Sequence, residues 1–370
     1  MADRGTVEML VRSASWAGRR VLVTGHTGFK GGWLSLWLKS LGAEVTGFAL
    51  APPSVPSLFE QARLAELVRH VEGDVRDQAA VDSVVRLAEP QVVFHLAAQP
   101  LVRLSYEQPV ETFAANVMGT AHLLDSCRRA GGVEAVVCVT SDKCYENREW
   151  PWAYRECDPM GGHDPYSASK GAAELVIAAY RRSFFQDGCR IASVRAGNVI
   201  GGGDWAADRL VPDIIRALEA GEKPLIRSPD SVRPWQHVLD ALSGYLLVAE
   251  KLMEGRDECA AGWNFGPSEA DTRPVRWIVE TLLAEWGAEG GWDKPAGPQP
   301  HEAAQLRLDS ARARSELGWE PQLDLGQSLK LTAQWHKAVH SGADARAVTL
   351  EQIARYGGRE PMIMEQVQWA

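Results

Sequence analysis

The sequence lacks several features that would place it in other classes of protein. It has no block of Lys and Arg, and its formal net charge at pH 7 is −9, so we expect no binding to nucleic acid. No apolar run is long enough to cross a membrane, so we expect no membrane partner. The N-terminus carries Asp3 and Glu8 and no apolar stretch typical of a secretory signal. Low-complexity segments and repeats of fixed period are missing too.

Cysteine is scarce and is not arranged for metal binding. The chain has six cysteines, at positions 127, 138, 144, 157, 189 and 259. They form no Cys-x-x-Cys pair and no spacing typical of metal ligands, so we expect no metal site. Their pattern indicates reduced thiols in a cytoplasmic protein.

Strand-like and helix-like segments alternate along the first half of the chain. Its 370 residues suggest about two domains. We expect strands at 20–24, 44–48, 68–73, 92–96, 135–140 and 190–195, and helices at 78–88, 112–130 and 166–185. This alternation predicts an α/β protein with a doubly wound, parallel, Rossmann-type sheet. After Asn198 the pattern changes, which indicates a smaller C-terminal substrate-binding region.

A glycine-rich loop follows the first predicted strand. Gly25, Gly28 and Gly31 lie between the apolar run at 20–24 and a helix that includes Trp33 and Trp37. Glycine lets backbone amides approach a pyrophosphate, and the new helix presents its positive end to that charge. The loop therefore predicts a dinucleotide site. We expect an NAD-binding domain at 17–200, to which later segments return, a mainly substrate-binding region at 201–345, and peripheral termini at 1–16 and 346–370.

Tyr166 and Lys170 are four residues apart and share one face of a predicted helix. A phenol has an ordinary pKa of about 10, and a neighbouring ammonium lowers it. Such a pair can take the proton of a sugar hydroxyl while a hydride leaves the same carbon. The spacing alone also occurs on ordinary helix faces; the preceding glycine loop favours the catalytic interpretation.

Together these features resemble the extended short-chain dehydrogenase/reductase family, and within it the CDP-glucose 4,6-dehydratases. The most specific segments are 24–31 (TGHTGFKG), 140–145 (TSDKCY), 195–205 (RAGNVIGGGDW) and 233–238 (RPWQHV). The resemblance implies a lyase that uses NAD to convert CDP-D-glucose to CDP-4-dehydro-6-deoxy-D-glucose. It also implies a role in deoxysugar synthesis for bacterial surface polysaccharides such as lipopolysaccharide O-antigen, and a homo-oligomer, either a dimer or a tetramer.

The resemblance also implies roles for the residues after the fifth predicted strand. Ser141 joins Tyr166 and Lys170 in handling the sugar O4. Asp142 acts as the acid for the leaving hydroxyl, which requires a raised pKa. Lys143 stands where related dehydratases carry a Glu base, and as a base it would need a lowered pKa. The alternative for Asp142 and Lys143 is a solvated turn with a weak surface ion pair.

The resemblance also predicts which residues bind the cofactor and the substrate. The expected cofactor contacts are Gly25, Thr27, Gly28, Phe29, Lys30, Gly31, Asp74, Val75, Leu96, Ala97, Ala98 and Gln99. The expected substrate contacts are Asn198, Arg209, Arg233, Gln236 and His301. Among them, Arg209 and Arg233 are candidates for the diphosphate, because a guanidinium binds phosphate oxygens through two parallel hydrogen bonds.

The cofactor and the reaction leave alternatives. The run 48–53 (FALAPP) contains neither the acid that usually binds the ribose 2′-hydroxyl nor an arginine for a 2′-phosphate. We favour NAD over NADP. His26 and Lys30 either add charge near the pyrophosphate or crowd it.

Two other functions remain open. A nucleotide-sugar 4-epimerase shares the Tyr-Lys pair but needs no elimination acid and base, and a catalytically silent NAD(H)-sensing protein is a further alternative.

Overall fold

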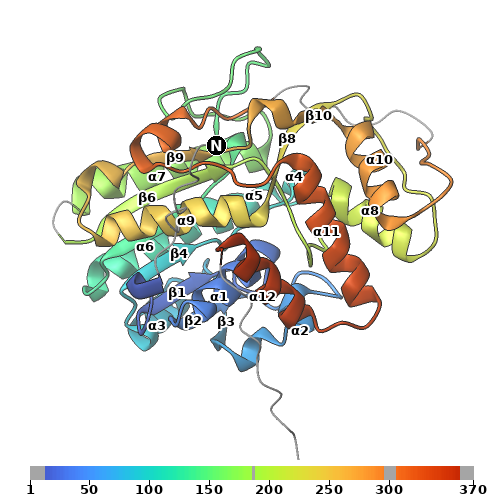
Figure 1. Cartoon of the computed structure of the whole chain (residues 1–370). Coiled ribbons are helices and arrows are strands. Elements are labelled where there is room, and N and C mark those ends of the chain that lie inside the picture. Colours follow the sequence, from blue (N-terminus) through green and yellow to red (C-terminus); the bar gives the residue numbers. More distant parts are fainter. Residues whose placement is uncertain (1–12, 186–187, 296–305, 359–370) are drawn as a thin grey trace, which may run out of the picture.

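A seven-stranded parallel sheet forms the centre of the computed structural model, which describes residues 13–185, 188–295 and 306–358. Its strand order is β3-β2-β1-β4-β5-β6-β9 (Figure 1). The strands are β1 (Arg20–Thr24), β2 (Glu44–Ala49), β3 (Arg69–Glu72), β4 (Val92–His95), β5 (Ala135–Val139), β6 (Arg190–Ala196) and β9 (Gly262–Phe265). The predicted doubly wound sheet is confirmed. The order reverses between β1 and β4, and a doubly wound sheet binds its ligands at that point.

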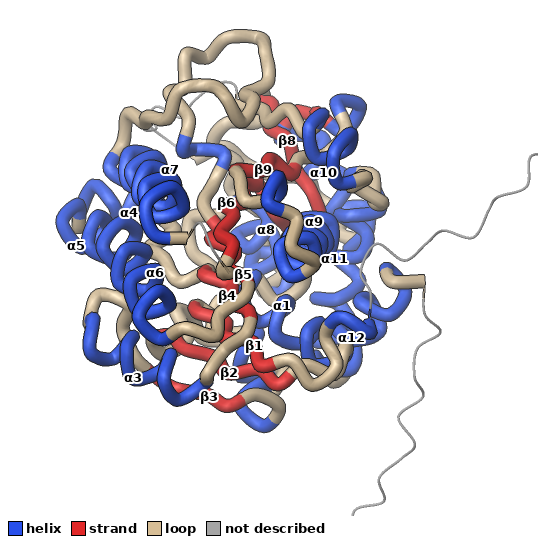
Figure 2. Tube along the Cα trace, turned by 90° about the vertical axis from the view of Figure 1, so that its left-hand side faces the viewer, coloured by secondary structure: helices blue, strands red, loops and turns tan. Residues whose placement is uncertain are grey.

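Helices cover both faces of this sheet, because its strands are apolar on both sides. In β1, Leu22 packs among α3 (Gln78–Ala88), α6 (Gly119–Ala130) and α7 (Pro165–Phe184). Its neighbours Val21 and Val23 point to the opposite face, toward α1 (Phe29–Ser40) and α9 (Val238–Met253). Figure 2 shows the strands between these two groups of helices.

The predicted helix at 112–130 begins earlier and is interrupted. It follows α4 (Val102–Glu107) and consists of α5 (Pro109–Phe113), a wider π-helical turn at Ala114–Met118, and α6. Such turns place one residue out of the regular helical register. Here the turn presents Asn116 to the inside of the protein, where this side chain is buried.

A smaller region lies at the carboxyl ends of β5 and β6. It has a three-stranded sheet of order β10-β8-β7, made of β7 (Asn198–Ile200), β8 (Val232–His237) and β10 (Thr272–Pro274). The helices α8 (Leu210–Glu219), α10 (Val275–Trp286) and α11 (Leu325–His340) pack around it. Both α9 and β9 come from beyond residue 200. The strand β9 joins the main sheet and α9 covers one of its faces, so later segments of the chain return to this sheet.

The described parts of the termini are not peripheral, contrary to our expectation. Trp16 is fully buried, and its Nε1 donates to Glu250 Oε1 at 2.7 Å. The helix α12 (Ala345–Tyr356) packs on α1, and the Tyr356 hydroxyl donates to Asp240 Oδ1 at 2.8 Å. Both segments bury apolar surface on the same face of the sheet, so Trp16 and α12 belong to the cover of that face.

Candidate active site

The glycine loop after β1 fits the pyrophosphate of a dinucleotide. Gly25 has φ of 77°, and a Cβ on it would lie 2.7 Å from Ala97 N. A Cβ on Gly31 would lie 2.2 Å from Gly25 O. The loop, the end of β4 and α1 therefore lie too close together for side chains at these positions. Gly28 caps α1 without a side-chain hydrogen bond, so the first amides of the helix, from Phe29 on, can bind an anion.

His26 adds no charge to this loop. Its ring packs on Phe59 at the β2–β3 side of the sheet, and its Nε2 lies 2.8 Å from His70 Nδ1. Burial, helped by His70, lowers the pKa of His26 to about 4. The imidazole is therefore neutral at pH 7 and faces away from the place for the pyrophosphate. The hydroxyl of the next residue, Thr27, donates to Leu50 O at 3.0 Å.

Lys30 instead points toward the candidate catalytic residues. Burial, with Arg209 and Lys170 nearby, lowers the pKa of Lys30 to about 8, while Asp142 and Asp204 oppose this shift. The ammonium thus belongs to a cluster of three cations and two carboxyl groups. The sequence placed Lys30 only at the cofactor loop and gave no sign that it reaches this cluster.

The other predicted cofactor residues lie after β3 and β4. Asp74 accepts hydrogen bonds from the backbone and side chain of Arg76, both at 2.8 Å. Val75 is buried. Thr24 Oγ1 accepts from the amides of Leu96 and Ala97, both at 3.2 Å. These bonds shape the crevice beside the glycine loop, and Leu96, Ala97, Ala98 and Gln99 along it stay partly accessible.

Asn116 holds this crevice to the catalytic helix and was not predicted. Its Oδ1 accepts from Gln99 N at 2.8 Å, and its Nδ2 donates to Ser169 Oγ at 2.8 Å. Ser169 lies on α7 between Tyr166 and Lys170. Sequence patterns for regular helices do not reveal the π-helical turn that carries Asn116, so the prediction missed this residue.

Local hydrogen bonds build the catalytic turn. Ser141 follows β5 and caps a single helical turn at Asp142–Cys144, where its Oγ accepts from Lys143 N at 3.2 Å. The same hydroxyl donates to Asp142 Oδ1 at 2.9 Å and is hydrogen-bonded to Tyr166. The turn and α7 thus bring Ser141, Asp142 and Tyr166 together.

The buried phenol of Tyr166 is difficult to ionise in the absence of ligands. Burial raises the pKa of Tyr166 to about 12, and Asp142 raises it further. The hydrogen bond between Ser141 and Tyr166 and the charge of Arg209 oppose this shift. Lys170 lies one turn along α7, where burial lowers its pKa to about 8 and its Nζ donates to Val139 O at 3.5 Å. The sequence argument gave the task of lowering the phenol pKa to Lys170 and assigned Arg209 only to the substrate diphosphate.

Asp142 has the environment that an acid requires. Its side chain is 6% exposed, and burial raises the pKa of its carboxyl group above the ordinary range, although Lys143, Ser141 and Arg233 oppose this. A Cβ on Gly197 would lie 3.2 Å from Asp142 Oδ2, so this oxygen faces the start of the substrate-side motif at 195–205. The description of Asp142 as part of a solvated surface turn does not fit this burial.

The predicted substrate residues have different environments. Arg209 caps α8 and pairs with Asp204, with 3.1 Å between Nη1 and Oδ2, and Arg233 acts electrostatically on Asp142. Asn198 Nδ2 donates to Pro234 O at 3.3 Å. Gln236 is 1% exposed and donates to Phe265 O at 2.7 Å, which ties β8 to β9; we leave it out of the proposed substrate site. His301 lies outside the described residues.

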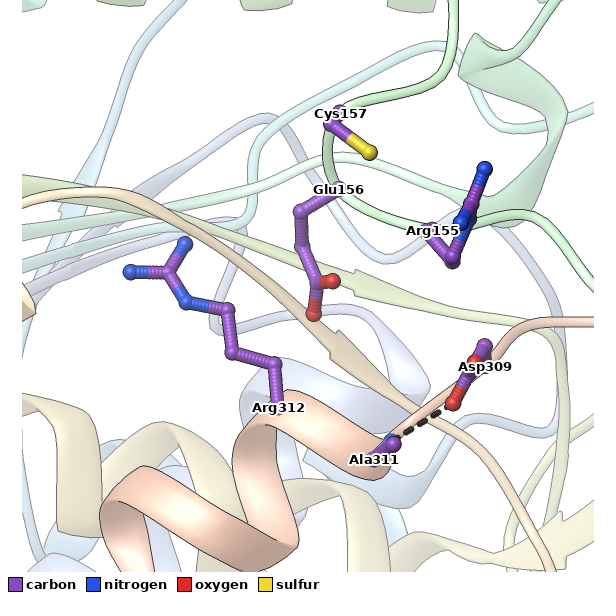
Figure 3. Close-up of a pocket in the computed structure, with 6 residues that line it drawn as sticks. All are labelled: Arg155, Glu156, Cys157, Asp309, Ala311 and Arg312. Carbon is purple, nitrogen blue, oxygen red and sulfur yellow. Dashed lines mark hydrogen bonds between the residues drawn. The ribbon is translucent and has the colours of Figure 1, made fainter.

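A separate cavity of about 340 Å³ lies along the outer edge of β9. Its lining residues, shown in Figure 3, are Arg155, Glu156, Cys157, Asp309, Ala311 and Arg312. Glu156 Oε1 accepts from Asn264 N at 3.0 Å, and Arg312 Nη1 donates to Gly262 O at 3.3 Å. Glu156 and Arg312 thus form hydrogen bonds with backbone groups on the free edge of β9, where a further strand could otherwise pair. The cavity shares no lining residue with the candidate active site.

The described parts of the chain contain neither a metal-binding cluster nor a membrane-spanning helix. Among the residues that the structure describes, no group of three or more His, Cys, Asp or Glu side chains is placed to hold a metal ion. Within the same ranges, no helix combines the length and apolar character needed to cross a bilayer.

Comparison with known proteins agrees with this geometry. Residues 21–260 match the model of the NAD dependent epimerase/dehydratase family, and the chain belongs to that family. A CDP-glucose 4,6-dehydratase from Salmonella typhimurium is 52% identical over 347 residues, which cover 92% of this chain and 97% of that protein. The resemblance read from the motifs is thus confirmed. A dTDP-glucose 4,6-dehydratase from Streptomyces antibioticus is 30% identical over 332 residues, or 86% of this chain and 92% of that protein.

Two solved structures show the same fold with cofactor bound. A dTDP-glucose 4,6-dehydratase from Streptomyces venezuelae with NAD and TYD bound has a TM-score of 0.73 and 26% identity, and covers 88% of this chain and 99% of that chain. A UDP-glucose 4-epimerase from Thermus thermophilus in complex with NAD has a TM-score of 0.74 and 26% identity, with coverage of 86% and 99%. NAD is therefore the cofactor of this protein.

Proposed function

We propose that this enzyme is a hydro-lyase that converts CDP-D-glucose to CDP-4-dehydro-6-deoxy-D-glucose. The observation that carries the proposal is the buried Asp142 carboxyl group, hydrogen-bonded to Ser141 beside Tyr166. An epimerase needs a base at O4 but no acid for a leaving hydroxyl, so this second group favours dehydration. The relative at 52% identity is named for this reaction.

Each residue of the site has one task in the proposed reaction. Tyr166 takes the O4 proton, with Ser141 hydrogen-bonded to its hydroxyl. Bound NAD supplies the hydride acceptor for C4 and the hydride donor for C6. The 4-ketone acidifies the proton on C5, which Lys143 removes, while Asp142 gives a proton to the hydroxyl that leaves C6 as water. A proton then returns to C5, so the reaction has no net redox change.

The diphosphate of the substrate is assigned to Arg209 and Arg233. Arg209 lies near Tyr166 and is oriented by Asp204, whereas Arg233 lies near Asp142. Guanidinium groups near Tyr166 and near Asp142 can hold a diphosphate. They thereby place the attached sugar between Tyr166 and Asp142. Lys30 adds a third cation on the cofactor side.

The test is to offer CDP-, dTDP-, GDP- and UDP-hexoses with NAD⁺ and to identify the products by mass and sugar configuration. We expect CDP-glucose to lose one water without net accumulation of NADH. An unchanged mass with inverted C4 would identify an epimerase. Binding of NAD⁺ without turnover of any nucleotide sugar would identify an NAD(H) sensor.

We further propose a homodimer that forms across α4–α7. The helices α4 to α7 lie side by side there (Figure 2). Their segment exposes the apolar side chains of Tyr106, Val110, Phe113, Met118, Leu175 and Phe184. Isolated apolar residues at a surface are common, but a group on adjacent helices indicates an interaction surface. Because most soluble oligomers are symmetric assemblies of one chain, a second copy is the proposed partner.

The remaining proposals concern the chain divisions and the cell. We assign NAD binding to 17–200 together with α9 and β9, and substrate binding mainly to 201–345. All six cysteines are free thiols, which suits a cytoplasmic enzyme. By resemblance, the product serves the synthesis of deoxysugars for surface polysaccharides such as lipopolysaccharide O-antigen.

A further inference from the structure

A buried carboxylate on α7 lies one turn beyond Lys170. Glu174 is 5% exposed and accepts hydrogen bonds from three residues. Thr140 Oγ1 donates at 2.5 Å, Ser193 Oγ at 2.7 Å, and Arg195 from Nε at 2.8 Å and Nη2 at 2.7 Å. Burial alone would raise the pKa of Glu174, but Arg195 and these donors hold it below its ordinary value. The pair is therefore ionised and joined by charge-assisted hydrogen bonds.

The remaining nitrogen of Arg195 reaches the far side of the catalytic turn. Its Nη1 donates to the Tyr145 hydroxyl at 2.6 Å, and this hydroxyl donates to Asn264 Oδ1 at 2.7 Å. The guanidinium also lies over the Tyr145 ring, with 5.2 Å between Cζ and the ring centroid. Arg195 thus connects Glu174 on α7 with Tyr145, and through Asn264 with β9.

These contacts hold the catalytic turn at both ends. Thr140 directly precedes Ser141 and Asp142, and Tyr145 directly follows the turn at Asp142–Cys144. Between them the backbone approaches α7 closely, because a Cβ on Gly171 would lie 3.0 Å from Cys144 O. The position of the turn relative to α7 is therefore set by two hydroxyl groups and one buried ion pair.

We propose that Glu174 and Arg195 are positioning residues that act through the Thr140 and Tyr145 hydroxyls to hold Asp142 in place for water elimination. This inference rests on the proposed role of Asp142. The carboxyl group of Asp142 is carried by the turn, whereas Tyr166 and Lys170 are carried by α7 itself. Loosening the turn therefore impairs elimination more than it impairs the oxidation at C4.

The ion pair itself is a poor place for the test, because removing one partner of a buried pair can unfold the protein. Thr140→Val and Tyr145→Phe remove only one hydroxyl each and keep the shape of the side chain. Thr140→Ser is the conservative variant that restores the hydroxyl. Tyr154→Phe is the matched control, because the Tyr154 ring stacks on Tyr145 at 5.3 Å between centroids while its hydroxyl contacts residues 147 and 148 instead.

In the experiment, each variant is saturated with NAD⁺ and then mixed with CDP-glucose. Fluorescence follows the bound NADH, and mass spectrometry follows the dehydrated product. We expect Thr140→Val and Tyr145→Phe to form dehydrated product between about 10- and 100-fold more slowly, the range for a catalytic group misplaced by about 1 Å. Bound NADH should accumulate in both variants. Thr140→Ser and Tyr154→Phe should behave like the parent.

Three results overturn parts of this scheme. Equal slowing of NADH formation and dehydration, together with a lower melting temperature, would show that the contacts serve stability alone. Accumulation of NADH in Asp142→Asn but in neither hydroxyl variant would overturn the positioning role and leave the role of Asp142 intact. Parental dehydration by Asp142→Asn would overturn the assignment on which both claims depend.

Discussion

At the scale of single residues, the site works by burying groups that water would otherwise keep in their ordinary ionisation states. Tyr166 and Asp142 both have raised pKa values because they are buried, while the buried Lys170 has a lowered one. A neutral carboxylic acid can donate a proton, whereas a buried phenol needs nearby positive charge before it can act as a base. Arg209 provides such charge and lowers the pKa of Tyr166.

Tyr166→Phe should abolish the reaction before any hydride is transferred. The variant keeps the aromatic ring but has no group for the O4 proton, so the rate should fall by about 10²–10⁴-fold, the usual contribution of acid–base catalysis. Initial rates and bound NADH after mixing with CDP-glucose measure the effect. Tyr180→Phe, at a half-buried position on the same helix, is the control. Near-parental rates in Tyr166→Phe would exclude the proposed base.

Asp142→Asn and Lys143→Met should stop the reaction at a later point. Both variants retain Tyr166 and Lys170, so oxidation at C4 should proceed and enzyme-bound NADH should appear. Dehydrated product should stay low, because the acid or the base for elimination is missing. Stopped-flow absorbance of NADH and mass analysis of the product separate the two half-reactions. If both variants dehydrate at the parental rate, the elimination groups lie elsewhere.

At the scale of secondary-structure elements, the short distance between the glycine loop and α1 determines how tightly NAD⁺ binds. Gly31→Ala would place its Cβ 2.2 Å from Gly25 O, so the helix and loop must separate. We expect NAD⁺ affinity to fall by about tenfold or more, since the amide groups at the helix end lose their alignment. Calorimetric titration with NAD⁺ measures this. Gly357→Ala, whose Cβ would make only ordinary contacts at 3.5 Å, should leave the affinity unchanged.

The same scale shows what the sequence can predict. Strands of β-branched residues and the glycine loop predicted β1 to β6 nearly to the residue, because buried parallel strands and helix starts have strong local signals. The short strand β9 was missed: its four residues, Gly-Trp-Asn-Phe, include a glycine and an asparagine, and its pairing with β6 depends on long-range packing.

The catalytic pair on α7 and the turn after β5 were predictable from motifs, whereas their support was not. Glu174 continues the four-residue spacing of Tyr166 and Lys170, which is a usable signal for a buried acid on this face. Its partner Arg195 lies in β6 and Thr140 directly follows β5, so they meet Glu174 only in the folded protein. Sequence spacing does not reveal such contacts, and it gave no sign that Lys30 reaches the site.

At the scale of the whole molecule, Leu175→Arg should convert the proposed homodimer to a monomer. Leu175 is 63% exposed on α7, and a charge there would remain unpaired in an apolar interface. Size-exclusion chromatography with light scattering measures the mass. Leu87→Arg, at an exposed site on α3, should leave the mass unchanged. A monomeric parent protein would contradict the proposal.

Acid should destabilise the protein through its buried histidines. Burial lowers the pKa of His26 to about 4 and those of His95, His237 and His336 to about 3. In the unfolded chain these groups have pKa values of about 6.5, so the unfolded state binds more protons at lower pH. The stabilising contribution is complete above about pH 6.5 and is lost as the pH falls toward 3.

Urea unfolding between pH 7.5 and 5.5 measures this effect. The free energy of unfolding should fall by up to about 1 kcal/mol per buried histidine between pH 6.5 and 5.5. His336→Gln should reduce the slope, whereas His163→Gln should not, because the His163 side chain is 75% exposed. An equal slope in His336→Gln and the parent would contradict the assignment.

The position of β9 at the edge of the main sheet has a consequence for synthesis on the ribosome. β6 is complete at Ala196, but the strand that pairs with its outer edge begins only at Gly262. A nascent chain that has emerged only as far as the intervening residues therefore exposes an unpaired, apolar strand edge, which can pair with other chains. Asn264, the hydrogen-bond acceptor for the Tyr145 hydroxyl, is also missing from such a chain. Truncation before residue 262 should therefore yield an aggregating fragment, and folding in the cell requires that this edge be shielded until β9 emerges.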